Sequence, residues 1–305
     1  MHLNLKVIET MAPEDHPNVF GMHANADLTY RSKTTKEMLE TVMDIQPKDA
    51  GGGGDGGPTR DEVVLMLSSK MLQDIPKNFN FVEVRKNIEK LNGGATAQPK
   101  PLNIHLKQEI DRMQIIISLT RKTLQGLELA IAGTVIMTPD LADCGTCLFD
   151  ARVPGAWLKK SWVAPTLGLW FGSGLVQRTA ELVLWLEGGR PKSFWLTGYF
   201  NAQGFLTAVQ QEVTRRHQGW SLDDIQVYTE VTAMEKEDVE KKDRLEEGVY
   251  VWGLFLEAAA WDKKKNGGQL VDAPPKKLFC PVPAMLVTAI KRYQRPSEVG
   301  GSESA

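Results

Sequence analysis

The stretch Phe194-Trp-Leu-Thr-Gly-Tyr-Phe-Asn-Ala-Gln-Gly-Phe-Leu-Thr-Ala-Val209, which continues to Arg215-Arg-His217, separates two differently patterned parts of the chain. Its aromatic residues flank Gly198 and Gly204 in the sequence. Apolar residues then recur at helical spacing, and the two arginines that follow are typical of the last turn of a helix. Helical patterns precede this stretch and strand patterns follow it. Because aromatic side chains bury large areas, we expect an aromatic joint that anchors a helical layer to a sheet.

Capping residues predict the helices that precede the joint. The patterns Thr34-Thr-Lys-Glu37 and Thr59-Arg-Asp-Glu62 are capping boxes, in which a hydroxyl and a carboxylate satisfy free N–H groups at a helix start. The first predicts a short helix that ends before Pro47. Asn80 predicts another cap, and Thr138, which precedes a proline, predicts a further start.

One helix is expected to be much longer than the others. It would begin with Asn103 as its cap and end at Gly133, and Thr120 is the one polar residue in its apolar seam. The seam consists of Leu106, Ile110, Met113, Ile117, Leu124, Leu127 and Ile131. This spacing favours a helix packed along a bundle, with coiled-coil dimerisation as the alternative.

Strand patterns follow the joint. Ile225–Thr232 alternates apolar and polar residues, Val249–Leu256 is apolar on both faces, and Leu278–Cys280 and Ala284–Ile290 are two further short runs. The charged segment Glu235–Glu247 between them predicts a solvated loop. The fold class is therefore α+β: an N-terminal helical part with one long helix, followed by a small antiparallel β-barrel or sheet.

Composition favours a soluble globular protein, with 42% hydrophobic and 24% charged residues. The formal net charge of -2 argues against electrostatic binding of nucleic acid. Neither a membrane span nor a signal-peptide pattern is expected. The three cysteines favour a reducing compartment. The run Gly51–Gly57 lacks the lysine and hydroxyl of a phosphate-binding loop, so it predicts a flexible linker and no ATP site.

Cys144-Gly-Thr-Cys147 is the motif that could carry chemistry. A C-x-x-C pair can be a thiol redox centre or half of a zinc site, and only Cys280 and five scattered histidines remain as further ligands. We favour two cysteines on a packed helix, with thiol redox or zinc as the alternative. A β module that holds a small ligand through its aromatic residues is another alternative. His217 favours a capping or packing role over general-base catalysis.

Several segments, taken together, resemble one family. They are Val19-Phe-Gly-Met-His-Ala-Asn-Ala-Asp27, Asp44-Ile-Gln-Pro47, Thr138-Pro-Asp-Leu141, Val153-Pro-Gly-Ala-Trp157, the joint itself, Gly248-Val-Tyr-Val-Trp-Gly-Leu-Phe-Leu-Glu257 with Trp261-Asp262, and Pro281-Val-Pro283. Their order and spacing resemble the C-terminal region of dynein heavy chains, in the axonemal form. The glycine run, the C-x-x-C pair and the residues from Lys291 onward depart from the family pattern.

The resemblance implies a division of the chain. Residues 1–50 would end the sixth AAA+ module of the motor ring as a remnant of its small subdomain, and residues 51–58 would be a glycine-rich linker. Residues 59–190 would form the helical part, residues 191–292 the joint, its helix and the antiparallel β-barrel part, and residues 293–305 a disordered tail.

The resemblance also implies a role. The chain would be a non-catalytic structural and regulatory region that packs on the AAA+ ring and modulates ATP-driven, microtubule-based movement in the axoneme of cilia or flagella. It would hold no cofactor, because ATP and magnesium would bind elsewhere in the motor. Its partners would be the AAA+ modules and linker of the same heavy chain, with neighbouring dynein chains as further candidates and microtubules reached only through the rest of the motor.

No catalytic, cofactor-binding or metal residue is expected in the region. The structural or interface candidates are Phe194, Trp195, Gly198, Phe200, Gly204, Phe205, Arg215, Arg216, Tyr250, Trp252 and Trp261.

Overall fold

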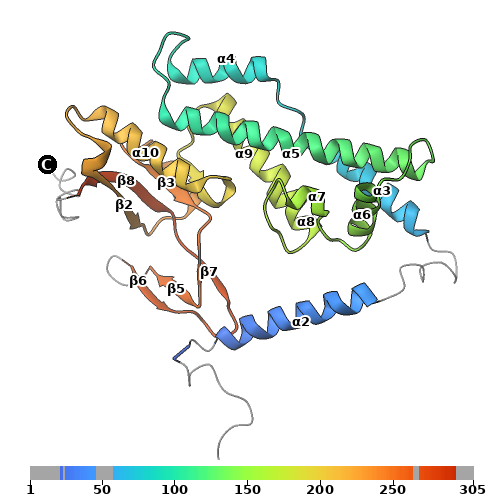
Figure 1. Cartoon of the computed structure of the whole chain (residues 1–305). Helices are drawn as coiled ribbons and strands as arrows, with labels where there is room; N and C mark the ends of the chain where they lie inside the picture. The colour runs from blue at the N-terminus through green and yellow to red at the C-terminus, as the bar shows by residue number, and fades with distance from the viewer. Residues whose placement is uncertain (1–20, 23–24, 46–57, 264–267, 293–305) are drawn as a thin grey trace, which may run out of the picture. The chain divides into compact units, whose positions relative to one another are not determined.

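The computed structural model describes residues 21–22, 25–45, 58–263 and 268–292 (Figure 1). The predicted glycine linker and C-terminal tail lie outside these residues, apart from Pro58. The polypeptide divides into two compact units. One comprises residues 51–253 and 284–305, here the larger unit, and the other comprises residues 1–50 and 254–283, the smaller unit. The predicted α+β class is confirmed.

Helices make up the first part of the larger unit. They are α3 (Arg60–Asp74), α4 (Phe81–Asn92), α5 (Pro101–Ile131), α6 (Pro139–Phe149), α7 (Gly155–Leu158), α8 (Leu167–Leu169), a π-helical turn (Trp170–Val176) and α9 (Gln177–Gly188). Thr59 forms the predicted capping box, since its N–H donates to Glu62 Oε2 at 2.7 Å and its hydroxyl accepts from Glu62 N. Asn80 caps α4 and Thr138 caps α6, as predicted.

The long helix α5 begins earlier than predicted. Lys100 is its N-cap and Pro101 occupies its first turn, where the missing N–H of proline leaves no donor unsatisfied. Asn103 is therefore inside the helix, and its side-chain amide donates to Asn92 Oδ1 at 2.8 Å. The predicted seam is buried from Leu106 to Leu127, including Thr120, and α5 contacts α3, α6, α9 and α10 of the same polypeptide. The seam is thus covered by bundle packing.

The main sheet has four strands in the order β1 (Ser193–Trp195), β3 (Val249–Trp252), β8 (Met285–Lys291) and β2 (Ile225–Val231). β1 pairs with β3 in parallel, and the other pairs are antiparallel. Within the described residues the strands form open sheets and no closed barrel. The predicted strand Val249–Leu256 is split, because Gly253 takes a φ of +88°, a conformation that favours glycine.

Helix α10 (Ala202–Arg216) contacts α5 as well as β8 and β2, so it joins the helical layer to the sheet (Figure 1). Two 3₁₀ turns flank it, at Leu196–Gly198 and Leu222–Asp224. The charged segment that predicted a loop contains α11 (Lys236–Lys241). Val239 anchors α11 because its buried side chain packs with Tyr250 of β3.

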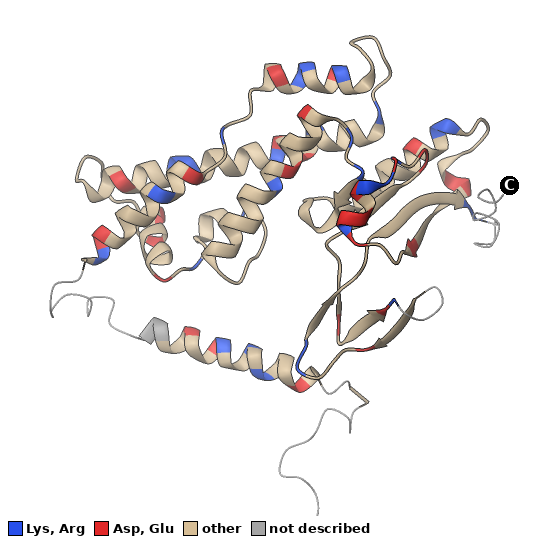
Figure 2. Ribbon diagram, turned by 180° about the vertical axis from the view of Figure 1, so that it is seen from behind, with Lys and Arg blue, Asp and Glu red and all other residues tan. Residues whose placement is uncertain are grey.

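The smaller unit holds α2 (Asn25–Ile45) and two antiparallel pairs of strands. These are β4 (Phe255–Glu257) with β7 (Phe279–Pro281), and β5 (Ala259–Asp262) with β6 (Gln269–Asp272). Thr34 does not start α2, since its hydroxyl bonds to Tyr30 O inside the helix. Acidic and basic residues both lie along α2 (Figure 2), and the ion pairs within this helix join residues four positions apart. The smaller unit thus includes both α2 and residues 254–283. The division of the chain that the resemblance implies stays a prediction.

Candidate functional site

Phe194 and Phe205 form the centre of the aromatic joint. Phe194 lies in β1 and Phe205 in the first turn of α10; both are buried, and their ring centroids are 5.1 Å apart. Trp185 of α9 meets Phe194 edge-on at 5.0 Å, and Tyr199 stacks on Phe205 at 5.0 Å. The cluster therefore ties a strand of the main sheet to two helices through buried rings.

The long helix α5 enters this cluster through His105 and Glu109. The His105 ring lies edge-on to Tyr199 at 5.0 Å and to Phe205 at 5.5 Å. One helical turn later, the Glu109 carboxylate accepts two backbone hydrogen bonds, from Phe200 N at 2.7 Å and from Asn201 N at 3.1 Å. Glu109 thus holds the backbone where it turns into α10. We call this pair of contacts the Glu109 clamp.

Burial shifts the pKa of both α5 residues. It lowers the pKa of His105 to about 4, and the nearby charge of Arg112 acts in the same direction. Burial also raises the pKa of Glu109, although the N–H groups of Phe200 and Asn201 oppose the shift because they favour the carboxylate. At neutral pH His105 is therefore an uncharged ring in the cluster.

At two glycines of the joint, a side chain would collide with a neighbouring residue. A Cβ at Gly204 would lie 2.4 Å from Asn201 Nδ2, and Asn201 Oδ1 caps α10 by accepting a hydrogen bond from Gly204 N at 2.9 Å. A Cβ at Gly198 would lie 2.7 Å from Trp195 Cε3. The turn between β1 and α10 therefore depends on both positions having no side chain.

A second row of rings and cations lies along the outer side of the joint. Trp195 of β1 and Trp252 of β3 stack at 5.6 Å with an angle of 11° between their planes. The Arg178 guanidinium lies 4.2 Å above Trp162 and 5.9 Å from Trp195, and Lys236 Nζ lies 3.9 Å above Trp252. Such stacks of cations on aromatic faces add attraction to the packing. Trp195 is half-buried here, so Phe194 and Phe205 are the more deeply buried anchors.

Phe200 connects the two parts of the joint. Its backbone N–H belongs to the Glu109 clamp, while its ring lies 5.6 Å from Trp162 in the outer row. Arg178 reaches the same turn, because its Nη2 donates to Thr197 O at 3.3 Å.

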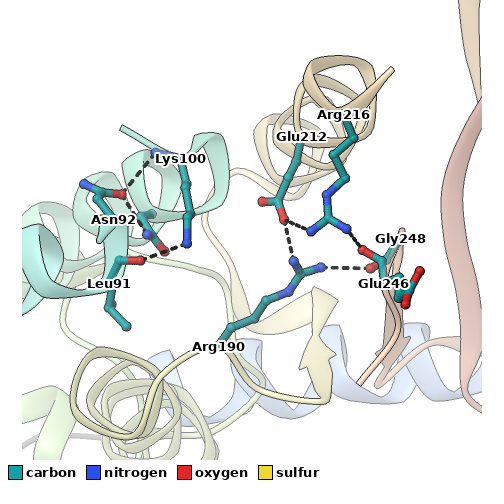
Figure 3. Close-up of polar contacts among 9 residues, drawn as sticks. Leu91, Asn92, Lys100, Arg190, Glu212, Arg216, Glu246 and Gly248 are labelled. Atoms are coloured by element: carbon teal, nitrogen blue, oxygen red, sulfur yellow. Dashed lines mark hydrogen bonds and ion pairs between the residues drawn. The ribbon is translucent and has the colours of Figure 1, made fainter. Parts of the chain in front are cut away.

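Arg215 and Arg216 lie apart from the rings, at the end of α10. Arg215 Nη1 donates to Pro99 O at 2.7 Å. Arg216 lies 3.6 Å from the Glu212 carboxylate and also donates to Glu246 O, and Glu212 pairs with Arg190 as well (Figure 3).

The last two predicted site residues belong to different units. Tyr250 is buried in β3 beside Val239 of α11 in the larger unit. Trp261 belongs to β5 of the smaller unit, next to Gly268, where a Cβ would lie 2.3 Å from Trp261 Nε1. The residues chosen from the sequence thus form one aromatic joint, one basic helix end and two separate rings, Tyr250 and Trp261. Their roles at an interface stay predictions.

Cys144 and Cys147 are buried on α6, and both are free thiols. Burial raises the pKa of Cys144 to about 12 and that of Cys147 to about 11. Reactive redox cysteines have a lowered pKa, so these environments disfavour thiol chemistry. Among the residues that the structure describes, no group of three His, Cys, Asp or Glu side chains could hold a metal ion.

Six residues of the joint are not among the site residues chosen from the sequence: His105, Glu109, Trp162, Arg178, Trp185 and Lys236. His105 and Glu109 each directly precede an apolar seam residue of α5, so the apolar periodicity that predicts the helix does not indicate that they are buried. No local signal separates this pair from surface polar pairs at the same spacing, such as Lys107 and Asp111 of the same helix.

Most of the sequence matches one protein family. The family model described as the C-terminal domain of the dynein heavy chain matches residues 32–302. The protein is 46% identical over 285 residues to dynein axonemal heavy chain 5 of Mus musculus, and the match covers 93% of this chain and 6% of that protein.

Two further relatives come from other organisms. The protein is 45% identical over 284 residues to the dynein gamma chain of the flagellar outer arm of Chlamydomonas reinhardtii, with 93% of this chain and 6% of that protein covered. It is 34% identical over 287 residues to the ciliary dynein beta chain of Tripneustes gratilla, with the same coverage of 93% and 6%. The chain therefore spans about 6% of the length of these relatives. None of its described helices is both long enough and apolar enough to cross a membrane.

Proposed function

The protein belongs to the family of C-terminal domains of dynein heavy chains, and from that premise we propose that it is a non-catalytic structural and regulatory region of an axonemal dynein motor. In this role it packs on the AAA+ ring and modulates the coupling between ATP hydrolysis and movement along microtubules. The family match over residues 32–302 is the observation that carries the proposal.

The joint gives this role a physical basis. A regulatory region that braces a ring has to transmit force between its own layers without yielding. The buried rings of Phe194 and Phe205 and the Glu109 clamp fix α5, α10 and the main sheet to one another. Close-packed protein interiors have low compressibility and transmit strain, which supports a mechanical role for the joint.

The partners follow from the same premise. We propose the AAA+ modules and the linker of the same heavy chain as direct partners, with neighbouring dynein chains as further candidates. Microtubules would be reached through the rest of the motor. The relatives are named as axonemal, flagellar and ciliary chains, which supports a place in the axoneme of a cilium or flagellum.

ATP and magnesium would bind elsewhere in the motor, so this region would need no cofactor of its own. Isothermal titration of the 305-residue polypeptide with Mg·ATP tests that statement. We expect no binding heat above dilution and no phosphate release. Saturable binding of one nucleotide per molecule would contradict the proposed non-catalytic role.

A further inference from the structure

A segment of four residues between α7 and α8, residues 162–165, is held to the larger unit by one aromatic side chain (Figure 1). We call these four residues the strap. None of their backbone N–H groups donates a hydrogen bond to a described residue, and the side chain of Val163 is 90% exposed. The chain is anchored again at Leu167, whose N–H donates to Ala151 O at 2.9 Å. The half-buried ring of Trp162 therefore makes the contacts that hold the strap.

The Trp162 ring packs against three different parts of the larger unit. It stacks on Trp170 with ring centroids 5.5 Å apart and 22° between the planes, and it lies 5.6 Å from the Phe200 ring of the joint. The Arg178 guanidinium lies 4.2 Å from its centroid. The ring also covers Gly174, where a Cβ would lie 2.4 Å from Trp162 Nε1. The closed position of the strap thus depends on the absence of a side chain at Gly174.

Gly174 belongs to a stretch of helix that is wider than an α-helix. Residues Trp170–Val176 form a π-helical turn, and Gln177 N donates to Gly172 O, five residues earlier. Glycine is a weak helix former, and both glycines of this turn lower its helix propensity. Gly174 is buried under the Trp162 ring, whereas Gly172 is exposed and a Cβ there would have no neighbour within 4 Å. Turns of this kind occur frequently at functional sites.

Arg178 connects the strap to the joint. It lies in the first turn of α9, directly after the π-helical turn, and its Nη2 donates to Thr197 O at 3.3 Å. Among the described residues this is the one hydrogen bond of the guanidinium, since its buried Nε has no partner. Aromatic faces hold the rest of the group, and that of Trp162 is the nearest. Thr197 lies three residues before Phe200, whose N–H belongs to the clamp.

We infer that the strap is a conformational switch, in which Trp162 closes on Gly174 or leaves it by local unfolding. In the closed state the ring holds Arg178 on the turn that leads into α10. In the open state Arg178 loses its nearest ring, and the clamp loosens. Segments with exposed backbone and few buried contacts are those that open locally in native proteins, and the strap has both properties. The inference does not depend on the proposed motor function, because contacts within the larger unit carry it.

Amide hydrogen exchange of the full polypeptide, followed by NMR, tests whether this opening occurs in the native protein. We expect the amides of Gln177, Phe200 and Asn201 to exchange through a common opening. Their protection factors should be lower than those of the buried seam of α5 by about tenfold or more. Protection equal to that of the seam would overturn the inference, since the strap would then open only when the whole protein unfolds. This measurement needs no variant.

Two substitutions test whether the Trp162 ring controls the opening. Trp162→Ala should speed exchange at Phe200 and Asn201 by about tenfold, the effect of losing one partly desolvated contact between a cation and an aromatic face. Gly174→Ala should act similarly, because the added methyl displaces the ring. In the double variant the methyl has no ring to displace, so Gly174→Ala should add less than about twofold to the effect of Trp162→Ala.

Gly172→Ala is the matched control, because it adds the same methyl to the same turn without a collision. Any gain in helix propensity is common to the two glycine variants. The control should leave exchange at Phe200 and Asn201 within about twofold of the unchanged protein. Equal acceleration by both glycine variants, or a Gly174→Ala effect that persists in full without the Trp162 ring, would overturn the inference by placing the effect in the helix. Unchanged exchange in Trp162→Ala would also overturn it.

Discussion

Glu109 accepts the backbone N–H of Phe200 at 2.7 Å across 91 residues of sequence. The bond joins the long helix α5 to the turn that starts α10, and a second bond from Asn201 N at 3.1 Å strengthens it. Because Glu109 is buried, these two donors and the nearby charges of Arg112 and Arg178 take the place of water around its carboxylate. The clamp is therefore a buried polar contact that holds α5 to the start of α10.

Loss of this carboxylate should loosen the joint. We expect Glu109→Ala to lower the free energy of unfolding by about 1–3 kcal/mol, because it leaves two backbone donors without an acceptor. Urea denaturation followed by circular dichroism measures the change. Glu83→Ala, at an exposed position near the start of α4, is the control and should cost less than about 1 kcal/mol. Equal losses in the two variants would contradict the importance of the clamp.

His105 should make stability depend on pH. Its pKa is about 4 in the folded protein and near 6.5 when unfolded, so the unfolded state binds more protons between these values. The stability that the neutral ring contributes is present above pH 6.5 and is lost as the pH falls toward 4. The loss amounts to about 3 kcal/mol.

The His105→Phe variant removes this contribution, since it keeps an aromatic ring but cannot titrate. Glu109 acts in the opposite sense, because its raised pKa makes stability fall as the pH rises through its folded pKa. The variant retains Glu109, so subtraction of the two pH profiles reports the titration of His105 together with its coupling to the Glu109 carboxylate, which lies 4.0 Å from His105 Nε2. A difference that stays constant between pH 4 and 7 would show that His105 is not shifted by burial.

The burial of each aromatic ring predicts how much its removal lowers the free energy of unfolding. Phe205 is fully buried, so Phe205→Ala should cost about 3–5 kcal/mol of unfolding free energy. Trp195 is half-buried against Trp252, and Trp195→Ala should cost clearly less. Denaturant titration of both variants gives the order. If Trp195→Ala proved the more damaging, the outer row and not the buried cluster would hold the joint.

The buried thiols should be inert in the native protein. Because burial raises the pKa of Cys144 to about 12 and that of Cys147 to about 11, almost no thiolate exists at pH 8. In a Cys280→Ser variant, Ellman's reagent should therefore label the pair only after guanidinium is added. Rapid labelling of two thiols under native conditions would revive the redox alternative.

The sequence predicts much of this fold because helix-capping residues and the spacing of apolar residues are local signals. The capping box at Thr59, the cap at Asn80 and the buried seam of α5 follow from residue spacing alone. The strand Ile225–Thr232 is recognised by its alternation and appears as β2.

What the sequence does not predict depends on contacts between distant residues. The apolar run from Val249 reads as one strand, yet Gly253 turns it from the main sheet into a second pairing with β7. Likewise, nothing local to Glu109 specifies Phe200 as its partner. The aromatic content of the joint is readable, but its polar clamp requires the folded protein.

The most direct test of the proposed regulatory role uses a recombinant dynein motor that carries this polypeptide as its C-terminal region. The measurement is the ratio of microtubule gliding velocity to ATP turnover rate for Glu109→Ala and for the Glu83→Ala control. We expect Glu109→Ala to lower this ratio while the affinity for Mg·ATP stays unchanged. An unchanged ratio, in a variant whose unfolding free energy is measurably reduced, would contradict mechanical coupling through the joint.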